Sequence, residues 1–230
     1  MDMGTLYLVR HGQASLGAEN YDQLSELGHR QSVRLGEYFA RAGLQFSSVI
    51  TGTLHRHGQT WAGIAQGMGL ITPLSQTACA LLRPGLNEYD SHALVRSVHT
   101  NELQKPDRPE HVHAYFKLLR EGLRQWMQGA SNPAGMPSYS EFERGVVQVL
   151  DEIRQTQDNT VLIVSSGGPI STAVAHILGA STEARIALNM QMRNSAVTEL
   201  RFTSKTHSLL TYNTLPHLDP VHHAGWMTHA

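Results

Sequence analysis

Residues 6–12, which read LYLVRHG, decide how the rest of this 230-residue chain is interpreted. Residues 6–9 are a short apolar run, which predicts a strand buried on both faces. Arg10 and His11 follow at once and stand at its carboxyl end, where open α/β sheets bind ligands. A guanidinium suits phosphate, and an imidazole is a neutral nucleophile near pH 7. The stretch predicts a phosphate site. A strand end that simply carries Arg and His is the alternative.

Composition limits the classes of protein that fit. The chain has 18 basic and 19 acidic residues, so neither nucleic acid nor a membrane is expected as a partner. The single cysteine, Cys79, excludes an internal disulfide and fits a reducing compartment. No apolar run approaches membrane-spanning length, and no signal pattern opens the chain. We expect a soluble cytoplasmic protein.

Residues 6–12 resemble the Arg-His-Gly signature of the histidine phosphatase superfamily, which includes the cofactor-dependent phosphoglycerate mutases. In that family the histidine attacks phosphorus and becomes a phosphohistidine, so the resemblance implies this role for His11. Residues 24–28, LSELG, resemble the family's Leu-Thr-x-x-Gly, which opens its first helix. Gly12 lets the chain turn sharply and leaves room for a ligand near the backbone.

A second block, residues 51–60, reads TGTLHRHGQT and follows an expected strand at residues 46–51. It resembles the family's Ser-x-x-Leu-x-Arg-Ala-x-Gln-Thr. Arg56 falls in register, whereas His57 stands where the family has alanine. Because a helix begins here, Arg56 and the helix N-terminus can both face an anion. A solvated charge on the helix surface is the alternative for Arg56.

A third block, residues 86–88, reads LNE and resembles the family's Leu-x-Glu, whose glutamate protonates the leaving group. The resemblance implies this role for Glu88, and a surface charge is the alternative. The Gly-x-Trp-Glu-Gly segment that often follows in mutases is absent, because the chain continues with DSHA at residues 90–93. This difference favours a phosphatase over a mutase.

The fourth block follows an expected buried strand at residues 160–165. A strand, a glycine turn and a helix N-terminus make an anion site. The family has Val-Ser-His-Gly-Gly here, and its histidine is the second catalytic one, whereas this chain has Ser166 followed by Gly167. Serine keeps a hydrogen bond but not the charge, so we expect a slow phosphatase. Ser166→His is expected to raise kcat about tenfold, unless the pocket has no room for an imidazole.

Strands that alternate with helices predict an α/β fold, a three-layer α/β/α sandwich around a mostly parallel sheet. We expect a single domain over residues 1–230, with a helical cap inserted at about residues 91–139. The tail, residues 215–230, is either disordered or folded over the site, as in some family members. Further strands are expected at residues 79–82, 194–202 and 209–212.

The expected reaction is hydrolysis of a small phosphomonoester through a phosphohistidine at His11. Arg10 and Arg56 keep the imidazole neutral and meet the charge of the phosphoryl group. Glu88 protonates the leaving oxygen. No metal or other cofactor is required, because the arginines supply the positive charge. The expected phosphate-binding residues are Arg10, Gly12, Ser15, Arg56, Ser166 and Gly167.

Three alternatives stay open at this point. One is mutase-type phosphoryl transfer to a second substrate. Another is a non-catalytic phosphate-binding pseudo-phosphatase, which Ser166 motivates. The third is an esterase with Ser166 as nucleophile and His11 as base, although a nucleophile elbow would need glycine at Val164. The substrate and the oligomeric state do not follow from the sequence.

Overall fold

The computed structural model describes residues 3–14, 22–70, 79–99, 108–156 and 158–229. The strands in these residues are β1 (Gly4–Arg10), β2 (Ser48–Thr51), β3 (Leu81–Leu82), β4 (Thr160–Ser165), β5 (Val197–Phe202) and β6 (His207–Thr214). The helices in the same part of the chain are α1 (Glu26–Arg41), α2 (His55–Gly67), α3 (Ser91–Val98), α4 (Pro109–Met127), α5 (Tyr139–Gln155), α6 (Gly167–Leu178) and α7 (Thr182–Met190).

All six of these strands form one sheet, in the order β3-β2-β4-β1-β5-β6. Neighbours among β1 to β4 are parallel, and β5 and β6 join antiparallel at the β1 edge. Leu8 pairs with Ile163, and Arg10 pairs with Ser165. Strands β1, β2 and β4 therefore end at one edge of the sheet, so the residues that follow them lie close together.

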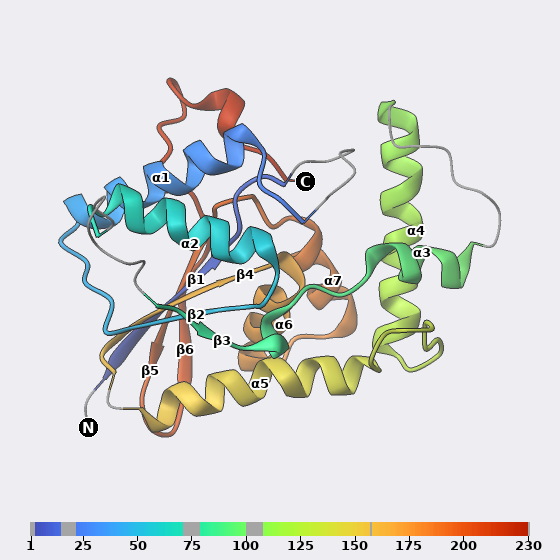
Figure 1. The fold of residues 1–230 in the computed structure, drawn as a ribbon. Coiled ribbons are helices and arrows are strands. Elements are labelled where there is room, and N and C mark those ends of the chain that lie inside the picture. The colour runs from blue at the N-terminus through green and yellow to red at the C-terminus, as the bar shows by residue number, and fades with distance from the viewer. Residues whose placement is uncertain (1–2, 15–21, 71–78, 100–107, 157, 230) are drawn as a thin grey trace.

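Helices cover both faces of the sheet (Figure 1). One face packs against α1 and α2 through an apolar cluster that includes Phe39 and Trp61. The other face packs against α5 and α6 through a second cluster that includes Val149 and Ile170. The sequence analysis predicted a buried strand at residues 160–165, and β4 is indeed buried from Val161 onward. The three-layer sandwich around a mostly parallel sheet is confirmed.

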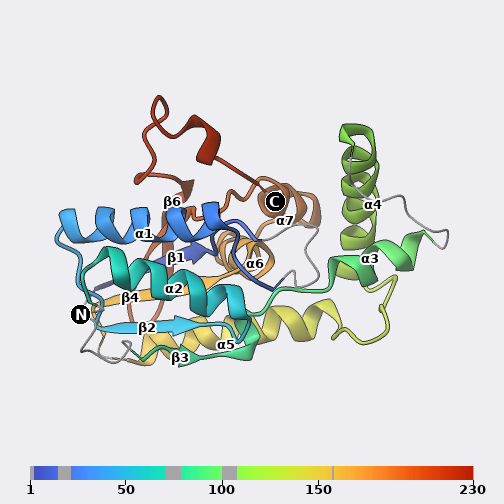
Figure 2. The same cartoon turned by 45° about the horizontal axis from the view of Figure 1, so that its top comes forward.

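Helices α3 and α4 stand beyond the carboxyl ends of β1 and β4 (Figures 1 and 2). They have an apolar cluster of their own, which includes Leu94, Leu123 and Trp126 and also takes in Tyr139 from α5. The sequence analysis expected helical structure at about residues 91–139 but predicted neither α3 nor α7 as a separate helix, and these have only 8 and 9 residues. Within the described residues, no helix has the length and apolarity needed to cross a membrane.

Strand β5 begins three residues later than the sequence predicts. Ser195 has a φ of 56°, in the left-handed region, which a strand does not accommodate. Its backbone N–H donates instead to the carbonyl of His11, at 3.1 Å. The residues before β5 therefore support the loop that follows β1.

Candidate active site

His11 is the first residue after β1, and its side chain is only 3% exposed. Its ring Nδ1 lies 2.7 Å from the carbonyl oxygen of Gly12. A carbonyl only accepts hydrogen bonds, so Nδ1 carries the proton and Nε2 keeps its lone pair. Burial, with Arg10 and then Arg56 nearby, lowers the pKa of His11 well below its usual value. The imidazole is therefore neutral, with a nucleophilic Nε2.

Arg10 lies beside His11 and is held by the end of the chain. Its guanidinium donates to the carbonyl of Met192 and, at 2.6 Å, to the carbonyl of His229. The backbone N–H of Asn194 donates to the carbonyl of Thr228, at 2.8 Å. Of the two alternatives for the tail, the structure therefore has the folded one, with residues 228 and 229 next to the site.

Arg56 is buried in the first turn of α2, and Asp22 fixes its position. Its Nη1 donates to Asp22 Oδ1 at 2.9 Å. Asp22 Oδ2 also accepts from the backbone N–H of His55, at 2.9 Å. Leu54, at the N-cap of α2, has no side chain able to cap the helix. The Asp22 carboxylate, which is remote in the sequence, caps it instead.

Glu88 follows a short 3-10 turn and lies at the N-terminus of α6. Its Oε2 accepts from the backbone N–H of Gly168, at 3.1 Å. Burial raises the pKa of this carboxyl, although the bond from Gly168 and the charges of Arg56 and Arg10 oppose the shift. A Cβ at position 168 would overlap with the Glu88 carboxylate, so glycine is required by this close approach. A carboxyl held in this way can carry a proton at higher pH than usual.

Ser166 is the N-cap residue of α6, and its side chain makes no capping hydrogen bond. It is fully buried, and its Oγ lies 2.8 Å from Nε2 of His57. Gly167, the first residue of α6, is also buried. The sequence analysis noted His57 only as a departure from the family's alanine, and that departure was the available signal for its place in the site.

The structure brings most of the predicted residues together. The pKa values of His11 and Glu88 both respond to Arg10 and Arg56, so the four groups share one electrostatic environment.

Two other predicted phosphate-binding residues have a different outcome. Ser15 lies outside the described residues. The amide of Gly12 already donates to Thr60 Oγ1, at 3.1 Å. The space that a Cβ would take at Gly12 is filled by the backbone of Gly28 rather than left for a ligand.

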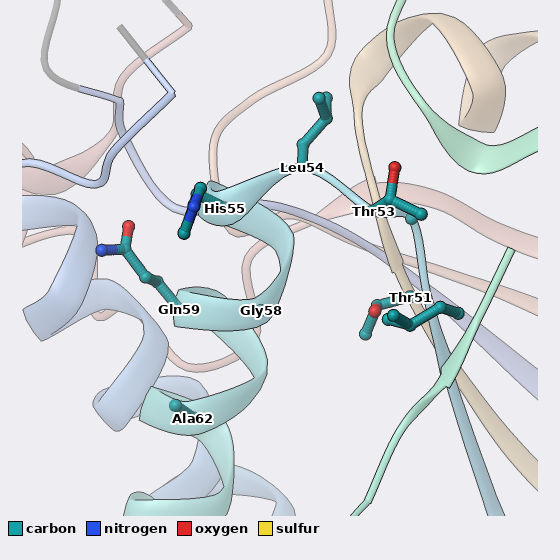
Figure 3. A pocket seen from close by; sticks show the side chains of 9 residues that line it. Thr51, Thr53, Leu54, His55, Gly58, Gln59 and Ala62 are labelled. Carbon is teal, nitrogen blue, oxygen red and sulfur yellow. The ribbon is translucent and has the colours of Figure 1, made fainter. Parts of the chain in front are cut away.

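A separate hollow of about 400 Å³ lies beside the start of α2. Figure 3 shows the side chains of Thr53, His55 and Gln59 around it. His11 and Glu88 do not line it, so it is not the site at the strand ends. Among the described residues, no group of three or more His, Cys, Asp or Glu is arranged to hold a metal ion.

Comparison with known proteins identifies the family. The model of the histidine phosphatase superfamily (branch 1) matches residues 6–215. A curated relative from Hydrogenobacter thermophilus, named "Putative phosphoserine phosphatase 2", is 23% identical over 226 residues, which are 94% of this chain and 98% of the relative.

Two solved structures share the fold. A phosphoglycerate mutase from Bacillus anthracis has a TM-score of 0.66 and is 16% identical, with 94% of this chain and 95% of the mutase covered. A mycobacterial glucosyl-3-phosphoglycerate phosphatase has a TM-score of 0.64 and is 20% identical, with coverage of 92% and 99%. Because a mutase and a phosphatase match equally well, the fold does not separate the two activities.

Proposed function

The chain belongs to the histidine phosphatase superfamily, and from this premise we propose that it hydrolyses small phosphomonoesters through a phosphohistidine at His11. The observation that carries the proposal is the hydrogen bond between His11 Nδ1 and the carbonyl of Gly12. It leaves Nε2 unprotonated at the end of β1, where the charges of Arg10 and Arg56 act on the ring. A neutral imidazole in that position is a nucleophile ready to attack phosphorus.

In the first step, Nε2 of His11 attacks phosphorus and the bond to the ester oxygen breaks. Glu88, whose pKa is raised by burial, gives its proton to the leaving oxygen. The charges of Arg10 and Arg56 stabilise the phosphoryl group in the transition state. Arg56 can do this with little reorganisation, since Asp22 already fixes its guanidinium.

In the second step, water attacks the phosphohistidine. Glu88, now ionised, accepts a proton from that water, and the bond between phosphorus and Nε2 breaks. The products are inorganic phosphate and His11 in its starting state. The Ser166 hydroxyl and the Gly167 amide at the start of α6 are proposed donors to the phosphoryl oxygens, and Ser15 a further one. No step requires a metal ion.

We propose a single domain in which α3 and α4 form a cap that selects the leaving group. Their separate apolar cluster supports this role, because it lets the two helices pack without the sheet. The curated relative's name refers to a small phosphorylated compound, which supports small phosphomonoesters as the substrate class. A panel with O-phosphoserine, 3-phosphoglycerate and p-nitrophenyl phosphate would identify the preferred leaving group.

The test is to trap the intermediate with a substrate labelled with ³²P. Phosphohistidine is labile in acid and stable in alkali, so label on the peptide that contains His11 should survive only an alkaline quench. His11→Ala should abolish both label and turnover. His29→Ala, which changes an exposed histidine on α1, is the matched control and should change neither.

Each alternative gives a different result in this experiment. Return of the labelled phosphoryl group to a second alcohol would indicate a mutase. Phosphate binding without turnover or label would indicate a pseudo-phosphatase. Hydrolysis of carboxylic esters that depends on Ser166 would indicate the esterase.

A further inference from the structure

We propose that His57 is a positioning residue whose imidazole orients the Ser166 hydroxyl as a hydrogen-bond donor to the phosphoryl group. The inference rests on the proposed function, because it concerns the same site. The two residues are 109 positions apart in the sequence, and their side chains meet between α2 and the start of α6.

The first observation is where the imidazole of His57 lies. The ring is fully buried, and its centroid is 5.9 Å from that of His11. Its Nε2 lies 2.8 Å from Ser166 Oγ. The ring of His57 therefore lies alongside the nucleophile and contacts the hydroxyl at the N-terminus of α6.

The second observation is that His57 is poorly explained as a core residue. Its Nδ1 is buried, with no hydrogen-bond partner among the described residues, and it faces Gly52. Burying a polar atom without a hydrogen-bond partner destabilises the folded state. A leucine would fill similar space without that cost, so stability alone does not account for an imidazole here.

The third observation is that the imidazole is neutral. Burial, and then the charge of Arg56, lower the pKa of His57 to about 3. A neutral ring has one N–H and one lone pair. His57 therefore acts on Ser166 through a hydrogen bond and does not supply a positive charge to the site.

The direction of that hydrogen bond follows from the anion beside it. If Ser166 donated to His57, its oxygen lone pairs would face the phosphoryl oxygens and repel them. If Nε2–H of His57 donates, the Ser166 proton is free to point at the phosphoryl group. A bound anion selects the second arrangement, and hydrogen bonds in such a chain strengthen one another. The Ser166 side chain is available for this, because it does not cap α6.

The test compares two substitutions at position 57. His57→Leu keeps most of the volume and removes the donor, and we expect kcat to fall about tenfold while KM changes less than twofold. His57→Gln places an amide N–H close to the position of Nε2, and we expect it to recover most of the lost kcat. The control is His29→Leu, the same substitution at an exposed position of α1, which should leave kcat unchanged.

A double-mutant cycle tests the pairing with Ser166. Ser166→Ala should lower kcat about as much as His57→Leu, and the double variant should lose no more than either single variant. Ser166→His alone should fall below the wild type, because the new ring would enter the space that His57 occupies. Combined with His57→Ala, which opens that space, it should regain activity.

Several results would overturn the proposal. Equal losses in His57→Leu and His57→Gln, or additive losses in the double variant, would leave His57 with a packing role only. Ser166→Ala with wild-type kcat would overturn it whether or not the His57 variants fold. If the wild type hydrolyses substrate and labels His11, and the variants at positions 57 and 166 have the wild-type kcat, then only this inference fails. A wild type with neither turnover nor label overturns both proposals.

Discussion

Two carboxylates occupy the N-termini of α2 and α6, which cover opposite faces of the sheet, and their surroundings differ. Asp22 lies at the start of α2, where it pairs with the Arg56 guanidinium, and its side chain is 30% exposed. Glu88 lies at the start of α6, where its nearest donors are the backbone amides of Gly168 and Tyr89. The charges of Arg56 and Arg10 favour the ionised form of Glu88, but burial outweighs them and raises its pKa.

This difference shows how one residue class takes two roles in one site. A carboxylate that pairs with a guanidinium fixes the position of that cation through charge-assisted hydrogen bonds. A carboxyl enclosed by protein favours its neutral form and can donate a proton. Asp22 is thus suited to hold Arg56 in place, and Glu88 to serve as the general acid.

The largest expected effect comes from Glu88→Gln, which removes the proton donor and keeps the shape. We expect kcat/KM, which reports the first step alone, to fall about a hundredfold for alkyl phosphates, within the range general acids contribute. The loss of kcat/KM should be much smaller for p-nitrophenyl phosphate, whose leaving group needs no proton. Steady-state kinetics with both substrates check this. An equal loss of kcat/KM for the two would mean that Glu88 is not the acid.

The pH profile is the next test of the comparison. Glu88 must be protonated for the first step, and its pKa is raised, so kcat/KM should fall about tenfold per pH unit once the pH exceeds that pKa. His11 must be neutral, and its pKa is lowered, so the acid limb should lie below the usual range of histidine. An alkaline limb that persists unchanged in Glu88→Gln would assign it to another group.

Asp22→Asn should have a smaller effect, through Arg56. The substitution keeps a hydrogen-bond acceptor but removes the charge that fixes the guanidinium. We expect kcat to fall about fivefold, which corresponds to roughly 1 kcal/mol in the transition state. The pH dependence should stay that of the wild type, since Glu88 is untouched. A rise in kcat would show that Asp22 competes with the phosphoryl group for Arg56.

Substitution of Asp22 should lower the stability of the protein more than substitution of Glu88, whereas substitution of Glu88 should lower catalytic activity more. Asp22→Ala removes the cap of α2 and should cost about 1 kcal/mol, lowering Tm by about 2–4 °C. Because the pKa of Glu88 is raised in the folded state, the stability that its protonated form contributes is lost as the pH rises from the usual pKa of a glutamate through the raised pKa. Glu88→Gln should therefore leave Tm at pH 7 unchanged or higher. Calorimetry of both variants against the wild type checks this, and a marked loss in Glu88→Gln would contradict it.

Much of the fold followed from local patterns in the sequence. Strands β1 and β4 were predicted because short apolar runs that end in polar residues identify buried parallel strands. The edge that carries His11, Arg56 and Ser166 followed from those strand ends. Helices α3 and α7 were missed, because a helix of two turns leaves little periodicity to detect.

The sequence by itself determined which residue types stand at the strand ends. Only the tertiary structure decided what those residues touch: Asp22 with Arg56, His229 with Arg10, and His57 with Ser166. The same applies to the His11 tautomer, which a single carbonyl selects. Periodicity is a property of neighbours along the chain. A hydrogen bond between residues 109 positions apart depends instead on how the sheet brings distant loops to one edge.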